Sequence, residues 1–199
     1  MDRLIPCKID RMKELILILG GARSGKSTYA EKLAWSLGQQ HVLYVATAEP
    51  LDQEMLDRIE KHQQQRPRAW RTLEAPRHPG RHLLNTPPQE PVILLDCMTL
   101  LVSNILLAHA DDEMAAIEAA VQAELADLIA AAHQIDGHFI IVSNEVGLGL
   151  VPDNALGRAY RDLLGRANQT LAQAADRVIF MVAGLPMTIK GASQSDPMH

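Results

Sequence analysis

The sequence predicts a single α/β domain with a largely parallel sheet covered by helices on both faces. Two observations support this fold class: apolar strands alternate with helical segments along the whole chain, and most of these strands are continuous apolar runs. Strands that are apolar on both faces suit a parallel sheet buried between helices. A length of 199 residues fits one domain. We expect it to span residues 13–190, after a possibly disordered extension over 1–12 and before a flexible tail over 191–199.

The amino-terminal half opens on an apolar run over residues 15–19, which two glycines end and which predicts a buried strand. Tyr29, Leu33 and Leu37 recur every four residues, so a helix is expected from Ser27 to Leu37. The next expected elements are a strand over 41–46, a helix from 52 to about 65, and a short strand near 70–73 within an otherwise irregular segment over 66–90.

The carboxyl-terminal half continues the alternation. Pro91 introduces a third apolar strand over 92–95. The remaining expected elements are a helix over 98–108 that is broken at 110–112, an alanine-rich helix over 115–133, a strand over 139–142, a helix over 155–175 and a last strand over 177–183. Because helices connect most successive strands, the strands are expected to run parallel.

A phosphate-binding loop lies between the first strand and the first helix. Its residues follow the spacing of a P-loop, and they are Gly20, Gly21, Ala22, Arg23, Ser24, Gly25, Lys26 and Ser27. The glycines leave the backbone free to turn over the phosphates, and successive N–H groups face the anion. Lys26 is expected to contact the β and γ phosphates and Ser27 to bind Mg²⁺. A turn that binds nothing would not need both residues. The predicted fold class is therefore a P-loop NTPase (RecA-like).

Two carboxylates follow predicted strands. Asp96 comes directly after the strand at 92–95, where a carboxylate can hold Mg²⁺ through water or activate an acceptor hydroxyl. It could also cap the helix that begins near Met98, and the two roles are compatible. Glu145 follows the strand at 139–142, at the sheet edge where doubly wound sheets bind ligands. It is expected either to contact substrate or metal, or to cap the next turn.

Composition excludes several classes of function. The net charge is −5 and the pI about 5.9, so no nucleic-acid-binding surface is implied. No apolar run reaches the roughly 18 residues of a membrane span, and the first eleven residues do not form a secretory signal. Cys7 and Cys97 make neither a disulfide framework nor a zinc site. A cytoplasmic protein with reduced thiols is expected, starting at Met1 or at Met12.

Several segments together resemble one family, the bifunctional adenosylcobinamide kinase / adenosylcobinamide-phosphate guanylyltransferases. They are the P-loop at 20–27, Tyr44-Val45-Ala46-Thr47-Ala48, residues 52–55 and 58–62, Arg66-Pro67, Trp70-Arg71-Thr72, Asp96-Cys97-Met98-Thr99 with Asn104, residues 142–152, Arg161-Asp162, Gly165-Arg166 and Asn168-Gln169. The resemblance extends from about residue 15 to 190, and residues 142–152 are its most specific segment.

The resemblance implies two reactions in the assembly of the nucleotide loop of cobalamin. A nucleoside triphosphate phosphorylates the aminopropanol hydroxyl of adenosylcobinamide. GMP is then transferred from GTP to that phosphate through a histidine phosphoramidate, which releases pyrophosphate and gives adenosylcobinamide-GDP. Alignment on Ile59 and Arg66-Pro67 identifies the histidine as His62. ATP and GTP are the implied substrates, Mg²⁺ the implied cofactor, and a homo-oligomer, possibly a trimer, the implied assembly.

The chemistry of His62 agrees with that role. A neutral imidazole is a competent nucleophile at pH 7. His62 lies three residues after Ile59 and seven after Met55, so it shares the inward face of that helix. Without the resemblance, an ordinary histidine near a helix end would be the better interpretation. The chain has Lys61-His62 where many members have two histidines, and Asp96 where members often have glutamate.

Further nucleotide contacts are expected beyond the P-loop. The candidates are Thr47, Ala48, Glu49, Arg66, Arg71, Glu74 and Asp96. Guanidinium groups match phosphate oxygens, so these arginines could bind a nucleotide. Arg66 and Arg71 could equally be solvated loop arginines, and for Arg77 the solvated interpretation is favoured.

Two other functions stay open on the sequence. One is a guanylyltransferase without the kinase step, since a single P-loop could serve only GTP. The other is a RecA-like ATPase or nucleotide-gated binding module. The acidic net charge argues against nucleic-acid work, and Asn144-Glu145-Val146-Gly147 argues against a generic ATPase.

Overall fold

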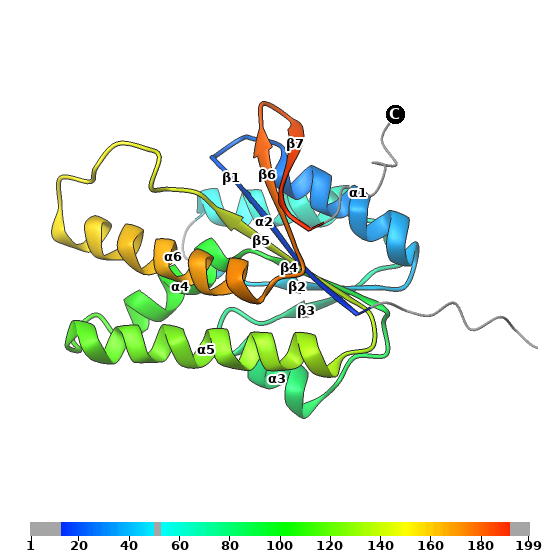
Figure 1. The fold of residues 1–199 in the computed structure, drawn as a ribbon, viewed down its shortest axis with the longest axis horizontal. Coiled ribbons are helices and arrows are strands. Elements are labelled where there is room, and N and C mark those ends of the chain that lie inside the picture. The colour runs from blue at the N-terminus through cyan, green and yellow to red at the C-terminus, as the bar shows by residue number, and fades with distance from the viewer. Residues whose placement is uncertain (1–12, 50–52, 192–199) are drawn as a thin grey trace, which may run out of the picture.

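The central sheet has six parallel strands and one antiparallel edge strand among the described residues, 13–49 and 53–191, of this computed structural model (Figure 1). The strand order is β3-β2-β4-β5-β1-β6-β7. The strands are β1 (Glu14–Gly20), β2 (Val42–Ala46), β3 (Arg71–Glu74), β4 (Val92–Asp96), β5 (His138–Asn144), β6 (Arg177–Val182) and β7 (Leu185–Lys190). The helices are α1 (Lys26–Gly38), α2 (Gln53–Gln65), α3 (Pro79–Asn85), α4 (Met98–Ala108), α5 (Met114–Gln134) and α6 (Ala155–Ala174).

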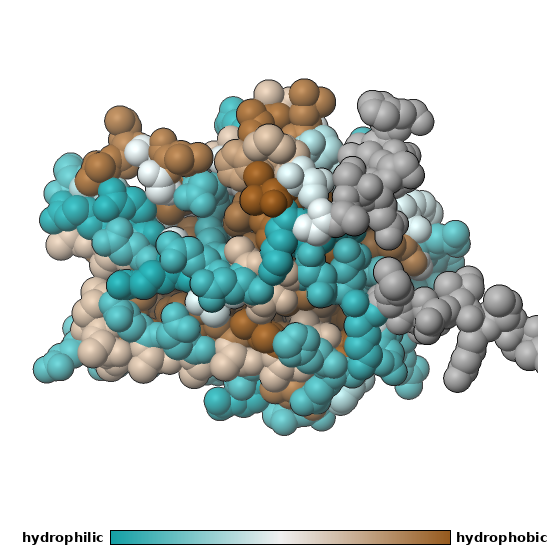
Figure 2. All heavy atoms as spheres, viewed as in Figure 1, coloured by the Kyte–Doolittle hydropathy of each residue, from teal (hydrophilic) through white to brown (hydrophobic). Residues whose placement is uncertain are grey.

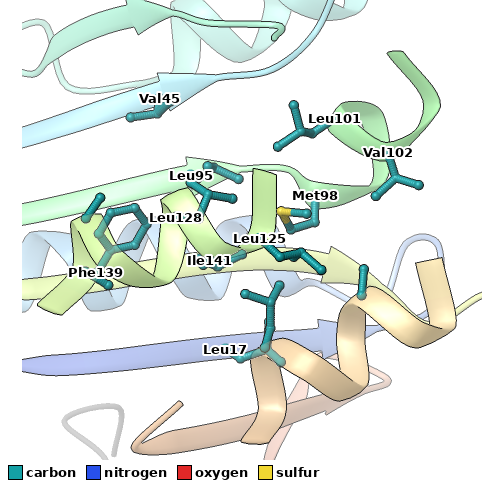
Figure 3. Packing of buried hydrophobic residues seen from close by; sticks show 14 of the residues in the cluster. Leu17, Val45, Leu95, Met98, Leu101, Val102, Leu125, Leu128, Phe139 and Ile141 are labelled. Atoms are coloured by element: carbon teal, nitrogen blue, oxygen red, sulfur yellow. The ribbon is translucent and has the colours of Figure 1, made fainter. Parts of the chain in front are cut away.

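Alternate residues of each buried strand pack into two separate cores. Leu15 and Leu17 of β1 belong to the core under helices α3 to α6, whereas Ile16 and Ile18 belong to the core under α1. Figure 3 shows Leu17 among the larger core, together with residues of β2, β4, β5, α4 and α5. Each such side chain contributes about 1.5–3 kcal/mol when fully buried. The predicted parallel sheet with helices on both faces is confirmed.

Helix α3 was not predicted, because the segment over 66–90 was expected to be irregular apart from one strand. The strand is present as β3, but Pro79 and Gly80 open a helix of seven residues. Gly80 packs so closely that a Cβ there would lie 2.6 Å from the backbone nitrogen of Leu128 on α5. Leu83 is buried beside it. Docking against α5, rather than an apolar repeat in the sequence, therefore stabilises α3.

Strand β7 was also missed. The last strand was expected over 177–183, but β6 ends at Val182 and the chain turns at Ala183 and Gly184, with φ of 51° and 83°. Two consecutive residues with positive φ form a two-residue hairpin turn whose twist matches that of the flanking strands. Residues 185–190 then pair antiparallel with β6. The expected amino-terminal extension and the tail beyond Gly191 lie outside the described residues.

The parallel strands all end at one edge of the sheet, which we call the carboxyl edge. Gly20 pairs in register with Asn144, and Ala46 pairs with Asp96. The ends of β1, β2, β4 and β5 therefore lie side by side. In the part of the chain that is described, no helix is long and apolar enough to cross a membrane.

Candidate active site

The phosphate loop closes tightly between β1 and α1. A Cβ on Gly20 would lie 2.5 Å from Ser24 Oγ and 2.8 Å from the Met181 carbonyl oxygen, so only glycine fits there. Gly25 has a φ of 90°, which favours glycine. Lys26 Nζ donates a hydrogen bond to the Gly21 carbonyl at 3.0 Å. The lysine charge therefore lies across the loop where a phosphate-binding lysine is expected.

The β6–β7 hairpin supports the loop from behind. The backbone N–H of Gly184 donates to the Ser24 carbonyl at 3.0 Å. A Cβ on Gly25 would lie 3.3 Å from the Gly184 Cα. This support was not predicted from the sequence, because β7 was missed. The Ala183-Gly184 pair between two runs rich in apolar residues is the signal that could have indicated it.

Asp96 is held at the end of β4 by a buried tyrosine. The Tyr44 hydroxyl donates to Asp96 Oδ2 at 3.0 Å, and Tyr44 is 2% exposed. Burial, and then the charge of Asp96, raise the pKa of the Tyr44 phenol, so it stays protonated and donates. Helix α4 begins after Cys97 with no side-chain cap. The alternative that Asp96 caps this helix is therefore wrong.

Thr47 fixes the chain that follows Asp96. Its Oγ1 donates to the Cys97 carbonyl at 2.7 Å and accepts from the Cys97 N–H at 2.8 Å. Asn104 Nδ2 in turn donates to the Thr47 carbonyl at 2.8 Å. Burial and the nearby Asp96 raise the pKa of the Cys97 thiol to about 11, so the thiol stays protonated at neutral pH. These contacts fix the backbone of Cys97, the residue that follows Asp96.

Lys26 lies in a partly buried environment. Burial lowers the pKa of its ammonium group, while Cys97 and Asp96 act in the opposite direction. A cation that is partly removed from solvent favours an anionic partner. The loop therefore offers Lys26 and its backbone N–H groups to a phosphate.

Arg66 reaches the same group of side chains. Its guanidinium lies 3.5 Å from the centre of the Tyr44 ring, and its Nε and Nη1 atoms are buried without a hydrogen-bond partner among the described residues. Arg71 does not come to the carboxyl edge. It lies at the start of β3, where Nε and Nη2 bind Glu90 at 2.6 and 3.0 Å. Of these two arginines, Arg66 is therefore the one with unpaired N–H groups, and it lies on the ring of the tyrosine that binds Asp96.

The remaining predicted contacts lie around the end of β2. Thr47 and Ala48 follow that strand directly, and Glu49 forms an ion pair with Arg77 at 3.1 Å. Glu74 ends β3 and pairs in register with Ala46, so it lies at the carboxyl edge.

His62 lies on α2, which is present over Gln53–Gln65 as expected. The side chain of His62 lies outside the described residues. Ile59, three residues before His62, is half-buried, whereas Leu56 is exposed.

Glu145 supports the loop that follows β5. Its N–H donates to the Gly20 carbonyl at 3.0 Å, and its Oε1 accepts from the Gly147 N–H at 3.0 Å. Of the two alternatives, the structure shows the turn-capping contact. A cavity of about 550 Å³ adjoins it, lined by Leu19, Glu145, Gly147, Arg161, Asp162, Gly165, Arg166, Asn168, Gln169 and Ala172.

A magnesium ion fits the oxygen atoms that this edge supplies. Ser27 provides a hydroxyl in the first turn of α1, and Asp96 provides a carboxylate. Mg²⁺ prefers oxygen ligands and commonly uses one or two protein groups together with waters and substrate phosphates. Within residues 13–49 and 53–191, no three His, Cys, Asp or Glu side chains form a metal cluster by themselves.

Comparison with known proteins agrees with this geometry. The family model described as "Cobinamide kinase / cobinamide phosphate guanyltransferase" matches residues 16–189. The "Bifunctional adenosylcobalamin biosynthesis protein CobU" of Escherichia coli is 43% identical over 182 residues, covering 88% of this chain and 99% of the relative. The corresponding CobP of Pseudomonas aeruginosa is 44% identical over 175 residues, covering 88% and 96%.

Solved structures resemble the chain in fold alone. The flagellar accessory protein FlaH from Methanocaldococcus jannaschii has a TM-score of 0.53 and 18% identity, covering 92% of this chain and 83% of that one. A KaiC-like protein from Pyrococcus horikoshii has a TM-score of 0.50 and 14% identity, covering 84% and 72%. Together with the sheet and the phosphate loop, they confirm the predicted P-loop NTPase fold class.

Proposed function

This chain belongs to the cobinamide kinase / cobinamide phosphate guanyltransferase family, and from that premise we propose that it phosphorylates adenosylcobinamide and then transfers GMP to the product through His62. The chain is a transferase of two activities, as its relatives are bifunctional. The observation that carries the kinase step is the convergence of Lys26 and Asp96 at one sheet edge.

The kinase step uses the phosphate loop and Asp96. The loop N–H groups and Lys26 bind the triphosphate, and the aminopropanol hydroxyl attacks the γ-phosphorus. A new oxygen–phosphorus bond forms while the bond to the β–γ bridging oxygen breaks, and the nucleoside diphosphate leaves. Asp96 takes the proton of the attacking hydroxyl. Tyr44, which donates to Oδ2, leaves the other carboxylate oxygen for this task.

Ser27 and Asp96 would hold Mg²⁺ together with substrate oxygens and water. Bound there, the ion would neutralise the charge that develops on the transferring phosphoryl group. The contacts that Thr47 makes with Cys97 restrict the peptide after Asp96, so the carboxylate keeps one orientation. Such preorganised charges contribute much of the rate of phosphoryl transfer.

The guanylyl step uses His62 as the nucleophile. An imidazole nitrogen attacks the α-phosphorus of GTP, and the bond to the α–β bridging oxygen breaks to release pyrophosphate. The phosphate oxygen of adenosylcobinamide phosphate then attacks the same phosphorus, and the nitrogen–phosphorus bond breaks to free His62. The position of α2 directly after β2 and the neighbouring Arg66 support this assignment.

The other nucleotide contacts follow from their places. Thr47, Ala48 and Glu49 border the same edge at the end of β2, and Glu74 ends the neighbouring strand. Arg66 offers unpaired N–H groups to phosphate oxygens. Arg71 would have to leave Glu90 before it could bind a nucleotide.

Two labelling experiments test the two steps. GTP labelled at its α-phosphate should leave label on the denatured protein, stable to base and released by acid, and the label should move to adenosylcobinamide phosphate when that acceptor is added. GTP or ATP labelled at the γ-phosphate should label adenosylcobinamide. The absence of the first label would exclude the histidine mechanism, and the absence of the second would leave only a guanylyltransferase.

We also infer that the protein forms a homo-oligomer, possibly a trimer, and works in the cytoplasm, where ATP and GTP are available. Figure 2 shows apolar side chains gathered over the β6–β7 hairpin and over the loop before α6. Those exposed there include Leu148, Leu150, Val151, Leu185, Met187 and Ile189. Apolar surface of this kind marks association sites. Sedimentation that gives a single monomer mass at micromolar concentration would contradict the inference.

A further inference from the structure

Asn144 occupies a central place at the carboxyl edge. It is the last residue of β5, the strand that lies between β4 with Asp96 and β1 with the phosphate loop. Asn144 pairs in register with Gly20, the first residue of that loop. A side chain here is therefore flanked by both parts of the proposed kinase site.

The direction of the Asn144 side chain follows from the alternation along β5. Ile140 and Val142 belong to the core under α1. Ser143 faces the opposite layer, where its Oγ donates to Asn168 Oδ1 at 2.6 Å. Successive strand residues point to opposite faces, so Asn144 points to the α1 side. Tyr44 belongs to the core on that side, and its hydroxyl binds Asp96 there.

The backbone of Asn144 is fixed on both sides. Its N–H donates to Thr99 Oγ1 at 3.0 Å, and its carbonyl accepts from Asn168 Nδ2 at 2.9 Å. Contacts from α4 and α6 thus hold the residue in one position. Supporting contacts of this kind hold a functional side chain in the position from which it acts.

The amide oxygen of Asn144 lacks a hydrogen-bond partner in the described part of the chain. Oδ1 is buried and makes no hydrogen bond among the described residues. Asn144 itself is half-buried, whereas two fully buried asparagines are bonded: Asn104 donates to Thr47 and Pro76, and Asn168 bonds to Ser143 and Asn144. A buried acceptor atom without a donor is destabilising. An unpaired acceptor atom at the edge of the sheet where ligands bind indicates that the ligand supplies a hydrogen-bond donor.

The chemistry of the two substrates identifies that donor. The phosphate groups of a nucleoside triphosphate at neutral pH offer only hydrogen-bond acceptors. The aminopropanol hydroxyl of adenosylcobinamide offers an O–H donor. We propose that Asn144 Oδ1 accepts the hydrogen bond of this hydroxyl and holds its oxygen in line with the γ-phosphorus. The proposal rests on the kinase function proposed above.

In this role Asn144 orients the nucleophile and takes no proton. The hydroxyl has one hydrogen, which is bonded to Asn144 Oδ1 while the oxygen begins its attack. As the oxygen forms its bond to the γ-phosphorus and the β–γ bridging oxygen leaves with the nucleoside diphosphate, the O–H turns to Asp96, which takes the proton. Because the transition state of phosphoryl transfer is loose, little proton transfer is needed before the bonds change. A neutral amide oxygen is then sufficient to align the attack.

Replacement of Asn144 by alanine tests the proposal. Asn144→Ala should lower kcat for phosphorylation of adenosylcobinamide roughly 10- to 100-fold, the cost of a misplaced nucleophile. Its Kd for a non-hydrolysable triphosphate should stay within about twofold, since Oδ1 does not contact phosphate. The amount of acid-labile GMP label formed from GTP should also be unchanged. Asn85→Ala, at an exposed residue that ends α3, is the matched control.

A second variant separates the role of the oxygen from damage to the fold. Asn144→Ser keeps an acceptor on a shorter side chain, so its kcat should lie between those of the unchanged chain and Asn144→Ala. A kcat for Asn144→Ala within about threefold of the unchanged chain would overturn the proposal. A loss of GMP label in Asn144→Ala that parallels its loss of kcat would overturn it too. The same holds if the kcat of Asn144→Ser is no higher than that of Asn144→Ala. If the protein without substitutions does not phosphorylate adenosylcobinamide, the proposed kinase function is refuted, and the role of Asn144 with it.

Discussion

The phosphate loop and helix α2 serve the two proposed reactions, but the fold holds them differently. The loop is braced by Gly184 behind it and by β5 beside it. Most of the described side chains of α2 face solvent, namely Gln53, Leu56, Asp57, Glu60, Gln63 and Gln64. Buried, hydrogen-bonded elements open rarely, and exposed ones open more readily. In the proposed mechanism the phosphates are bound at the sheet edge, whereas the histidine belongs to a helix whose described side chains are mostly exposed. The two reactions should therefore be separable by mutation.

The largest expected effect is the loss of the covalent intermediate in His62→Ala. No acid-labile GMP label should form, because no other group is proposed as the nucleophile. Phosphorylation of adenosylcobinamide should stay within about threefold, since α2 does not contact the γ-phosphate in the proposed mechanism. His41→Ala, at an exposed residue before β2, is the control. Undiminished label in His62→Ala would refute the proposed nucleophile.

Lys26→Ala should affect both reactions, because a single phosphate loop serves both nucleotides in the proposal. The rate of each step should fall roughly 10²–10³-fold, the usual cost of removing one preorganised charge or donor. The thermal midpoint should change little, since the one hydrogen bond that the half-buried lysine makes among the described residues is to the Gly21 carbonyl. Lys32→Ala, exposed on the same helix, should be neutral. A loss confined to the kinase step would mean that GTP binds elsewhere for guanylylation.

Gly184→Val tests whether the hairpin braces the loop. The φ of 83° is unfavourable for any other residue, and for a β-branched one most of all. Strain of about 1–2 kcal/mol should appear as roughly a tenfold weaker Kd for nucleotide. Gly165→Ala is the matched control, because a Cβ there meets nothing within 4 Å. Equal nucleotide affinity in Gly184→Val, measured by titration calorimetry, would show that the loop needs no brace.

The sequence predicted the regular part of this molecule because its signals are local. Buried parallel strands are continuous apolar runs, and the phosphate loop is a contiguous motif, so β1, α1 and Lys26 could be found without a structure. Helix α3 could not, because it depends on the fit of Gly80 against α5. A helix of seven residues is too short to show a periodic pattern.

The contacts that support the site could not be predicted from the sequence for a related reason. The contact of Tyr44 with Asp96 joins neighbouring strands, and that of Gly184 with Ser24 joins the two ends of the domain. Neither pair has a signature in the sequence, since a tyrosine in a buried strand is typical core. Besides the Ala183-Gly184 turn, a polar residue at the end of an apolar strand, as at Asn144, is a signal that was present and not used.

Tyr44→Phe removes one hydroxyl and keeps the ring on which Arg66 lies. The kinase rate should fall roughly three- to tenfold, because Asp96 loses one neutral donor worth about 0.5–1.5 kcal/mol. GMP labelling should be unchanged, since the ring still supports Arg66. Tyr160→Phe, whose hydroxyl donates to the Thr99 carbonyl at 3.2 Å, removes a similar bond away from Asp96. An equal fall in both variants would assign the effect to general loosening.

The smallest effect on either reaction is expected at Glu124, in the contact of α3 with α5 on the sheet face away from α1. Burial raises the pKa of this carboxyl, so the folded state favours its protonated form. The stability gained by protonation is present below the unfolded pKa near 4.5 and is lost as the pH rises through the folded value. Glu124→Gln imitates the protonated form and can still accept from the Gly80 N–H. Its thermal midpoint at pH 8 should therefore rise by about 2–4 °C, for about 1 kcal/mol, and should equal that of the unchanged chain near pH 4. A lower midpoint at pH 8 would show that the pair with His78, at 3.2 Å, outweighs the cost of burying the charge.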